Sequence, residues 1–314
     1  MNPSPLTRRR ALGAACALPA LMIAGCQSRP PAASPQPPPL QPATPLKIGL
    51  ALGGGAARGF AHIGVIKALE AQGIVPDLIA GTSAGSVVGA LYAAGLSGFD
   101  LQRQALQMDE STIADWTLPS RGVLRGEALQ AYINKVLDGR TIEQLPRRLA
   151  ITATDLKTGE LAVFDRGNTG QAVRASSSVP AVFQPVMIGG REFVDGGLVS
   201  PVPAAVVRRM GAHVVIAVDI SSRPATQPLG GSIDLLLQTF AIMGQSIAAL
   251  ELRDADVVIR PALGATKGTD FNARHASILE GETAASAQMT EIRRAINAAR
   301  ERLSAAQRPA AKAG

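Results

Sequence analysis

The stretch Pro76-Asp-Leu-Ile-Ala-Gly-Thr-Ser-Ala-Gly-Ser-Val-Val-Gly-Ala90 is the segment that decides how this chain folds. It predicts a short apolar strand, a sharp turn that carries Ser83, and then a helix built from small residues. Within it, Gly81-Thr-Ser83-Ala-Gly85 follows the pattern G-x-S-x-G. A strand–turn–helix context is what a nucleophile elbow requires, because the strained turn keeps the serine hydroxyl accessible. The pentapeptide alone is weak evidence for a nucleophile, so the rest of the chain must decide whether Ser83 has this role.

Apolar runs and helical patterns alternate on both sides of this stretch. Strands are predicted at 47–52, 76–80, 148–154, 161–164, 213–218 and 255–259, and a hairpin that turns at Gly189-Gly190 is predicted at 187–194. Helices are predicted at 59–71, 84–94, 100–108, 126–137, from about 203, at 233–252 and at 277–305. This alternation predicts an α/β fold, a three-layer sandwich with a mostly parallel central sheet.

Composition narrows the class of protein. Of the 314 residues, 46% are hydrophobic and 18% are charged, which is typical of a globular chain. Aromatic residues make up only 3%, which argues against a base-stacking surface, so no nucleic-acid partner is expected. The net charge is +7, but without Arg8, Arg9 and Arg10 the remaining 28 basic and 24 acidic residues leave only +4. That mild bias is compatible with an anionic membrane surface or with no charged partner at all.

The N-terminal segment has the pattern of an export signal. Arg8 to Arg10 are followed by the apolar run 11–25, which is too short to span a bilayer. The run ends in Leu21-Met-Ile-Ala-Gly-Cys26, which resembles the lipobox of bacterial lipoproteins, in which the cysteine is acylated. We therefore expect a signal peptide at 1–25 and a lipidated Cys26. An ordinary signal peptide and a twin-arginine signal remain alternatives.

The resemblance of this segment to lipoprotein sorting signals also implies a cellular location. Gln27 stands where an aspartate would retain a lipoprotein in the inner membrane, which favours a lipid anchor in the outer membrane of a bacterial envelope, facing the periplasm. The proline-rich stretch 26–46 predicts an extended tether, and 307–314 predicts a frayed tail. The only cysteines are Cys16 and Cys26, so a processed chain has no disulfide and no cysteine metal site. No cluster has metal-ligand spacing, so neither a metal nor a cofactor is expected.

Two further segments carry candidate chemistry. Gly53-Gly-Gly-Ala-Ala-Arg-Gly59 stands between a predicted strand and a predicted helix, where converging N–H groups can hold an anion. A dinucleotide loop is not favoured, because the G-x-G-x-x-G spacing places Arg58 where the third glycine belongs, and a P-loop ending is missing. In Phe193-Val-Asp195-Gly-Gly197, an aspartate ends a predicted strand beside two glycines.

Together these motifs resemble those of the patatin-like phospholipases, in the same order. The segments 151–160 and 175–183 also resemble bacterial members. The resemblance is strong over 50–209, the expected catalytic domain, and looser over 210–306, the expected C-terminal extension of the same patatin-like fold. Ala56 is a departure, because many members carry a glycine at this position. An N–H donor survives that change only if the local φ tolerates a Cβ.

The resemblance implies a lipid acyl hydrolase of the phospholipase A or lysophospholipase type, acting on a membrane lipid or another fatty-acyl ester. It implies a catalytic dyad in which Ser83 is the nucleophile and Asp195 accepts its proton. The implied oxyanion hole is formed by main-chain N–H groups of three residues with help from an arginine: Gly54, Gly55, Ala56 and Arg58. The motif glycines are Gly53, Gly59, Gly81, Gly85, Gly196 and Gly197.

Two other functions stay open. A Ser–Asp–His hydrolase would need one of the three histidines, His62, His213 or His275, and none of them lies in a signature turn. A non-catalytic envelope lipoprotein could keep the fold to bind lipid or a protein partner, although it would not need both Ser83 and Asp195. The segment 233–252 could lie on a membrane, but it has no Lys/Arg face, so we expect a helix that packs in the core.

Overall fold

The structure is a computed structural model that describes residues 45–108, 115, 122–222, 230–264 and 270–307. The predicted signal peptide with Cys26, nearly all of the predicted tether, and the last seven residues of the predicted tail lie outside these residues. These predictions therefore stay predictions.

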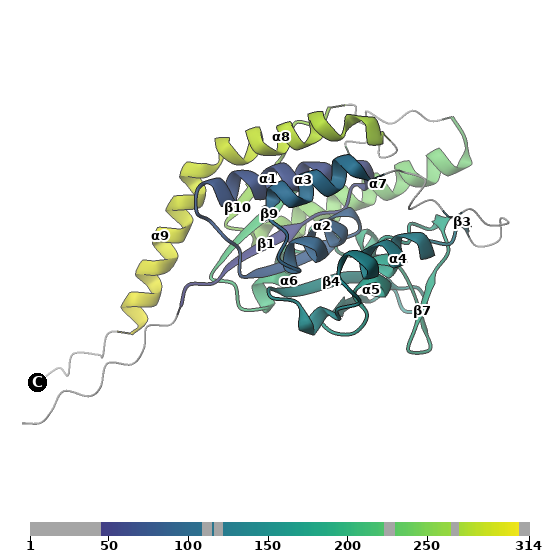
Figure 1. Cartoon of the computed structure of the whole chain (residues 1–314), viewed down its shortest axis with the longest axis horizontal. Helices are drawn as coiled ribbons and strands as arrows, with labels where there is room; N and C mark the ends of the chain where they lie inside the picture. Colours follow the sequence, from purple (N-terminus) through teal and green to yellow (C-terminus); the bar gives the residue numbers. More distant parts are fainter. Residues whose placement is uncertain (1–44, 109–114, 116–121, 223–229, 265–269, 308–314) are drawn as a thin grey trace, which may run out of the picture. The chain divides into compact units, whose positions relative to one another are not determined.

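The described part of the chain forms an α/β fold around an eight-stranded sheet (Figure 1). The strand order is β10-β9-β1-β2-β4-β8-β7, with β5 paired to β4. The strands are β1 (Ile48–Leu52), β2 (Leu78–Thr82), β4 (Arg148–Asp155), β5 (Leu161–Phe164), β7 (Val186–Ile188), β8 (Arg191–Asp195), β9 (Val214–Val218) and β10 (Val257–Ile259). The five strands from β10 to β4 are parallel, and β5, β8 and β7 add in antiparallel orientation. The mostly parallel sheet was predicted correctly.

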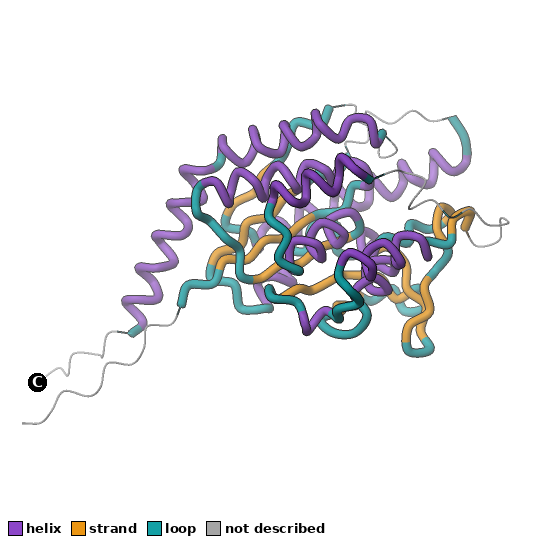
Figure 2. The backbone as a smooth tube through the Cα atoms, in the orientation of Figure 1, coloured by secondary structure: helices purple, strands orange, loops and turns teal. Residues whose placement is uncertain are grey.

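Helices cover both faces of this sheet, and Figure 2 shows the strands running between them. Side chains alternate along β1, so Leu50 and Leu52 join a large apolar cluster on one face while Ala51 joins a smaller one on the other. The large cluster contains residues of α1 (Phe60–Ala71), α2 (Ala84–Ala93), α3 (Gly98–Gln107), α4 (Glu127–Val136), α5 (Thr169–Ser176), α8 (Arg274–Ala287) and α9 (Met289–Ala306). The smaller cluster contains α6 (Ala204–Arg209) and the C-terminal end of α7 (Ser232–Glu251). The predicted three layers are confirmed.

A separate two-stranded parallel sheet pairs β3 (Gly122–Leu124) with β6 (Ala181–Phe183). The predicted hairpin is confirmed: β7 and β8 pair in antiparallel orientation around Gly189 and Gly190, both of which have positive φ.

Two strands share one edge of β4. β2 runs parallel to β4 with Thr82 opposite Thr152, and β8 runs antiparallel to it with Asp195 opposite Ala153. Because β5 pairs with Thr152 and Ala153 on the other edge, β2 and β8 must follow one another along the same edge. The carboxyl ends of these two strands therefore meet, and the residue after β2 lies beside the last residue of β8.

Two helix predictions are wrong. The single helix expected at 277–305 is divided into α8 and α9, because Gln288 has a ψ of 1°, which is outside the helical range. The division lets α8 pack along α1 while α9 turns its buried Ile292 and Ile296 toward the sheet. The helix at 233–252 is present as α7, but only its C-terminal end packs in the core. The stretch Asp234–Asp254 is apolar and long enough to cross a membrane by length and composition, and of its 18-residue apolar window only 6% is buried.

The contact between α1 and α8 depends on two glycines. A Cβ built on Gly64 would lie 1.9 Å from the carbonyl oxygen of Ile278, and one built on Gly281 would lie 2.0 Å from that of Ala61. Both contacts are far inside van der Waals distance and involve main-chain atoms, so only glycine lets the two helices approach this closely.

We expect Gly281→Ala to lower the free energy of unfolding by about 1–3 kcal/mol, because α8 must move away from α1. The matched control is Gly244→Ala on α7, where the new Cβ would meet nothing closer than the Gly197 carbonyl oxygen at 4.0 Å. That change should raise stability by about 0.5–1 kcal/mol through helix propensity. Urea unfolding of both variants measures the difference, and equal stabilities would contradict the glycine contact.

Candidate active site

Ser83 occupies the predicted turn between β2 and α2, with φ 51° and ψ −122°. This backbone conformation is rare for a residue with a side chain and stores strain. Its carbonyl oxygen accepts hydrogen bonds from the Oγ of Ser86 at 2.6 Å and from the Ser86 N–H at 2.8 Å. Its own N–H donates to the Oγ of Ser176 at 2.8 Å. The surrounding structure thus holds the turn from both sides, and the predicted strand–turn–helix is confirmed.

The glycines of the pentapeptide are required by close packing. A Cβ on Gly81 would lie 2.4 Å from the Gly85 carbonyl oxygen, and a Cβ on Gly85 would lie 2.1 Å from the Leu52 carbonyl oxygen. A Cβ on Gly196 would likewise lie 2.5 Å from the carbonyl oxygen of Thr152. The positions of these glycines in the sequence therefore mark where the ends of β1, β2 and β4 lie close together.

Asp195 is the last residue of β8, and its side chain is buried. Its main chain is fixed by two hydrogen bonds, because its N–H donates to the Ser178 carbonyl oxygen and its carbonyl oxygen accepts from the Oγ of Thr154. The carboxylate accepts the N–H of Gly197 at 2.7 Å, and the Ser83 side chain lies close enough to lower its pKa. Burial raises the pKa of Asp195 to about 6, against the opposing effect of the Ser83 side chain and the Gly197 N–H.

The C-terminal end of α5 touches both residues, which the sequence alone did not predict. Ser176 accepts the N–H of Ser83, and the carbonyl oxygen of Ser178 accepts the N–H of Asp195. The Oγ of Ser178 donates in turn to the carbonyl oxygen of Arg174. The serines belong to the segment 175–183, whose resemblance to bacterial members was the one sequence signal that could have identified them.

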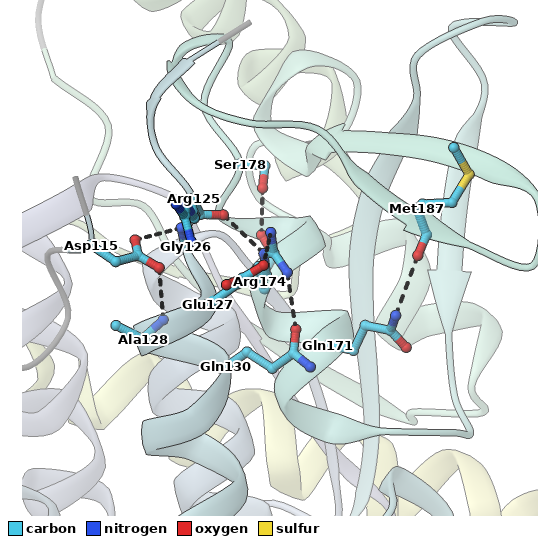
Figure 3. A network of polar contacts seen from close by, with 10 residues as sticks. All are labelled: Asp115, Arg125, Gly126, Glu127, Ala128, Gln130, Gln171, Arg174, Ser178 and Met187. Atoms are coloured by element: carbon cyan, nitrogen blue, oxygen red, sulfur yellow. Dashed lines mark hydrogen bonds and ion pairs between the residues drawn. The ribbon is translucent and has the colours of Figure 1, made fainter. Parts of the chain in front are cut away.

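Arg174 ties this end of α5 to the start of α4 (Figure 3). Its Nε donates to the Arg125 carbonyl oxygen at 3.0 Å, and its guanidinium lies 3.8 Å from the carboxylate of Glu127. Asp115 caps the same start of α4, because it accepts the N–H groups of Gly126 and Ala128. Arg174 thus connects the helix that ends at Ser176 to the start of α4, which Asp115 caps.

The glycine-rich loop lies against Ser83, since a Cβ on Gly54 would be 3.3 Å from the Ser83 Cβ. The N–H of Gly54 already donates to the Pro201 carbonyl oxygen at 3.0 Å, so it is not left over for an oxyanion. The N–H of Gly53 donates to Val218. Within the described residues, the N–H groups of Gly55 and Ala56 have no acceptor, and these two remain as candidate oxyanion donors.

Ala56 begins a short 3-10 helix, η1 (Ala56–Gly59), and has a φ of 50°. The chain thus keeps an alanine in the left-handed region that favours glycine, at a cost of about 1–2 kcal/mol. The side chain is exposed, so no neighbour opposes it.

Arg58 follows in η1 and is buried. Its Nη2 donates to the carbonyl oxygen of Ser221 at 2.9 Å, beyond the end of β9. The side chain lines a cavity of about 500 Å³ together with Asp219, Gln245, Leu252 and Arg260. The Arg260 Nε bonds to the Asp219 carboxylate at 3.3 Å within this cavity.

The three histidines serve other contacts. The Nε2 of His62 donates to the Gly53 carbonyl oxygen at 2.8 Å, and burial lowers its pKa to about 4, so the ring is neutral and supports the loop. The Nδ1 of His213 accepts the N–H of Lys47, and His275 is exposed on α8. Over the described ranges, none of the three is hydrogen-bonded to Ser83 or Asp195. The same part of the chain contains no group of three or more His, Cys, Asp or Glu residues that could hold a metal ion.

Comparison with known proteins identifies relatives of this chain. A family model described as patatin-like phospholipase matches residues 50–208, half of the chain. An uncharacterized NTE family protein of Mycobacterium tuberculosis is 38% identical over 182 residues, which cover 57% of this chain and 50% of that protein. The human patatin-like phospholipase domain-containing protein 6 is 36% identical over 187 residues, which cover 57% of this chain but 14% of its own length. The chain therefore matches half or less of these relatives.

Among solved structures, VipD from Legionella pneumophila has a TM-score of 0.52 at 14% identity, covering 82% of this chain and 68% of its own. At this identity the likeness concerns the fold alone.

Replacing the strained alanine tests the loop geometry. We expect Ala56→Gly to raise the free energy of unfolding by about 0.5–1 kcal/mol, because relief of the positive φ exceeds the entropy gained by the unfolded chain. Ala71→Gly is the matched control, since Ala71 is equally exposed but ends α1. It should be destabilising. Thermal unfolding measures both, and a loss of stability in both variants would contradict a strained Ala56.

Proposed function

The chain belongs to the patatin-like phospholipase family, and we propose that it is a lipid acyl hydrolase that cleaves carboxylic esters with Ser83 and Asp195. One observation carries this proposal. A strained, buried serine lies beside a buried carboxylate whose pKa is raised to about 6, and the serine side chain is one of the groups that act on that pKa. A binding protein has no need of this pairing, which combines backbone strain with a desolvated charge.

In the proposed acylation step, the Oγ of Ser83 attacks the ester carbonyl carbon while Asp195 accepts the hydroxyl proton. The carbonyl oxygen becomes an oxyanion, and the N–H groups of Gly55 and Ala56 stabilise it. When the tetrahedral intermediate collapses, the bond to the leaving alcohol breaks and that alcohol takes the proton from Asp195. An acyl-enzyme on Ser83 remains.

In the deacylation step, Asp195 removes a proton from a water molecule, which attacks the acyl carbon. The second intermediate releases the fatty acid, and Ser83 regains its proton from Asp195. The raised pKa of Asp195 favours this role, because a carboxylate with a pKa near 6 is a better base for a hydroxyl than one near 4.

The proposal includes location. An acylated Cys26 with the 26–46 tether would hold the hydrolase at the periplasmic face of an outer membrane, close to acyl-ester substrates. The alternative is a non-catalytic lipid-binding lipoprotein. A fluorophosphonate probe separates the two, because only an activated Ser83 would be labelled.

Activity of the two candidate residues is the first test. We expect Ser83→Ala and Asp195→Asn each to lower kcat/KM for p-nitrophenyl butyrate and for a lysophospholipid by about 10³-fold or more. Ser286→Ala and Asp165→Asn are matched controls at exposed positions and should keep the parental rate. Circular dichroism checks that each variant is folded. Undiminished turnover by folded Ser83→Ala would contradict the proposed mechanism.

The pH dependence tests the base. Asp195 must be ionised to accept a proton, so kcat/KM should be constant above its pKa of about 6 and fall about tenfold per pH unit below it. Burial also raises the pKa of Glu251 to about 6, so this limb must be assigned to one carboxylate. The profile of Glu251→Gln should keep the limb. If the acid limb disappears in Glu251→Gln, or if the rate does not change from pH 7 to pH 5, Asp195 is not the base.

A further inference from the structure

The exposed face of α7 is the largest feature that the proposed mechanism leaves unused. Leu235, Ile242, Met243 and Leu250 are 59%, 51%, 52% and 58% exposed. Their spacing, together with that of Thr239 and Ser246, places all six side chains within about 100° on a helix. The stripe is therefore continuous along about 22 Å of the helix, unlike the scattered apolar residues of an ordinary surface.

The two hydroxyls within this stripe donate to main-chain oxygens of the helix and so do not depend on water as a hydrogen-bond partner. The Oγ1 of Thr239 donates to the Leu235 carbonyl oxygen at 2.9 Å, and the Oγ of Ser246 donates to the Ile242 carbonyl oxygen at 3.4 Å. Hydroxyls that donate to the carbonyl one turn earlier can enter an apolar medium without losing a donor contact. The face is thus chemically suited to hydrocarbon.

The opposite side of α7 is attached to the protein. Ala248 is buried, and Glu251 accepts hydrogen bonds from the Oγ of Ser200 and the N–H of Val202. Gly244 lies beside the carbonyl oxygen of Gly197 in η4 (Gly196–Leu198), the turn that directly follows Asp195. An occupant of the exposed face would therefore lie about one helix diameter, roughly 10 Å, from the turn that follows Asp195. A helix packed in this way lies along a surface and does not cross it.

We propose that the Leu235–Leu250 face of α7 docks on the surface of a lipid bilayer and brings Ser83 to its ester substrates. The proposal rests on the proposed function, which supplies the lipid. A second copy of the chain is the less favoured occupant, because a stable interface takes roughly 800 Å² from each partner and this stripe offers four apolar side chains of one helix.

Charge defines the kind of bilayer. Residues 232–251 contain Asp234 and Glu251 but no lysine or arginine, so attraction to anionic lipid is not what holds the face. Docking by apolar burial alone should work on zwitterionic lipid and should not weaken as salt is raised.

A site-specific fluorophore tests the docking itself. The full chain with Cys16→Ser and Cys26→Ser contains no other cysteine, so an NBD label can be placed by Met243→Cys or, as the matched control, by Leu279→Cys. Leu279 is 60% exposed on α8. With phosphatidylcholine vesicles we expect a blue shift of the emission at position 243 at low and high salt, and none at position 279. No shift at 243, or equal shifts at both positions, would overturn the proposal. So would a concentration-dependent shift at 243 without vesicles, which would indicate a second copy.

Turnover links the docking to catalysis. Replacing two apolar side chains by Ile242→Gln with Met243→Gln should lower hydrolysis of vesicle lipid about tenfold, since less apolar surface is buried on docking. The rate on p-nitrophenyl butyrate in solution should not change, and Leu279→Gln should lower neither rate. A parallel loss on both substrates would overturn the docking role. If the parental chain hydrolyses neither substrate, the proposed function fails, while the label at position 243 still decides the docking.

Discussion

The candidate site depends on one constraint, the sharing of a single edge of β4 by two strands that run toward each other. Thr82 ends β2 and bonds through its Oγ1 to the Oγ1 of Thr152 at 2.6 Å and to the Ser200 carbonyl oxygen at 2.7 Å. β8 arrives from the opposite direction and ends at Asp195, opposite Ala153. Main-chain atoms crowd this junction, which is why glycines stand at positions 81, 85 and 196.

Local strain is concentrated at this junction, and the rest of the fold holds it in place. Ser83 and Ala56 both have positive φ, and Asp195 is removed from water. Each of these is unfavourable in isolation. They persist because Ser176 and Ser86 fix the turn around Ser83, while the Gly197 N–H donates to the Asp195 carboxylate. Such a distribution is typical of a site where geometry matters more than stability.

Sequence patterns predicted those parts of the site that steric rules dictate. Gly81, Gly85 and Gly196 are needed because main-chain atoms crowd them, and a sequence records such a need as a fixed residue type. The contacts of Ser176 could not be predicted, since a serine on a short helix carries no signal of its partner. The exposure of α7 was missed for a related reason. An apolar helix has the same periodicity whether its partner is the protein core or hydrocarbon, so a pattern cannot distinguish them.

The meeting of β2 and β8 also has a kinetic consequence. The proposed nucleophile is in place once β2 and α2 have formed, but the proposed base is contributed by a strand far along the chain, after α3, α4 and α5. Such non-local pairing is slow to form, because the entropic cost of closing a long loop comes before the favourable contact is made. Under the proposed mechanism, a chain that has folded only as far as α5 therefore presents Ser83 without its proton acceptor. Ser83 would then become reactive only after β8 has paired with β4, so hydrolysis would require a completed sheet.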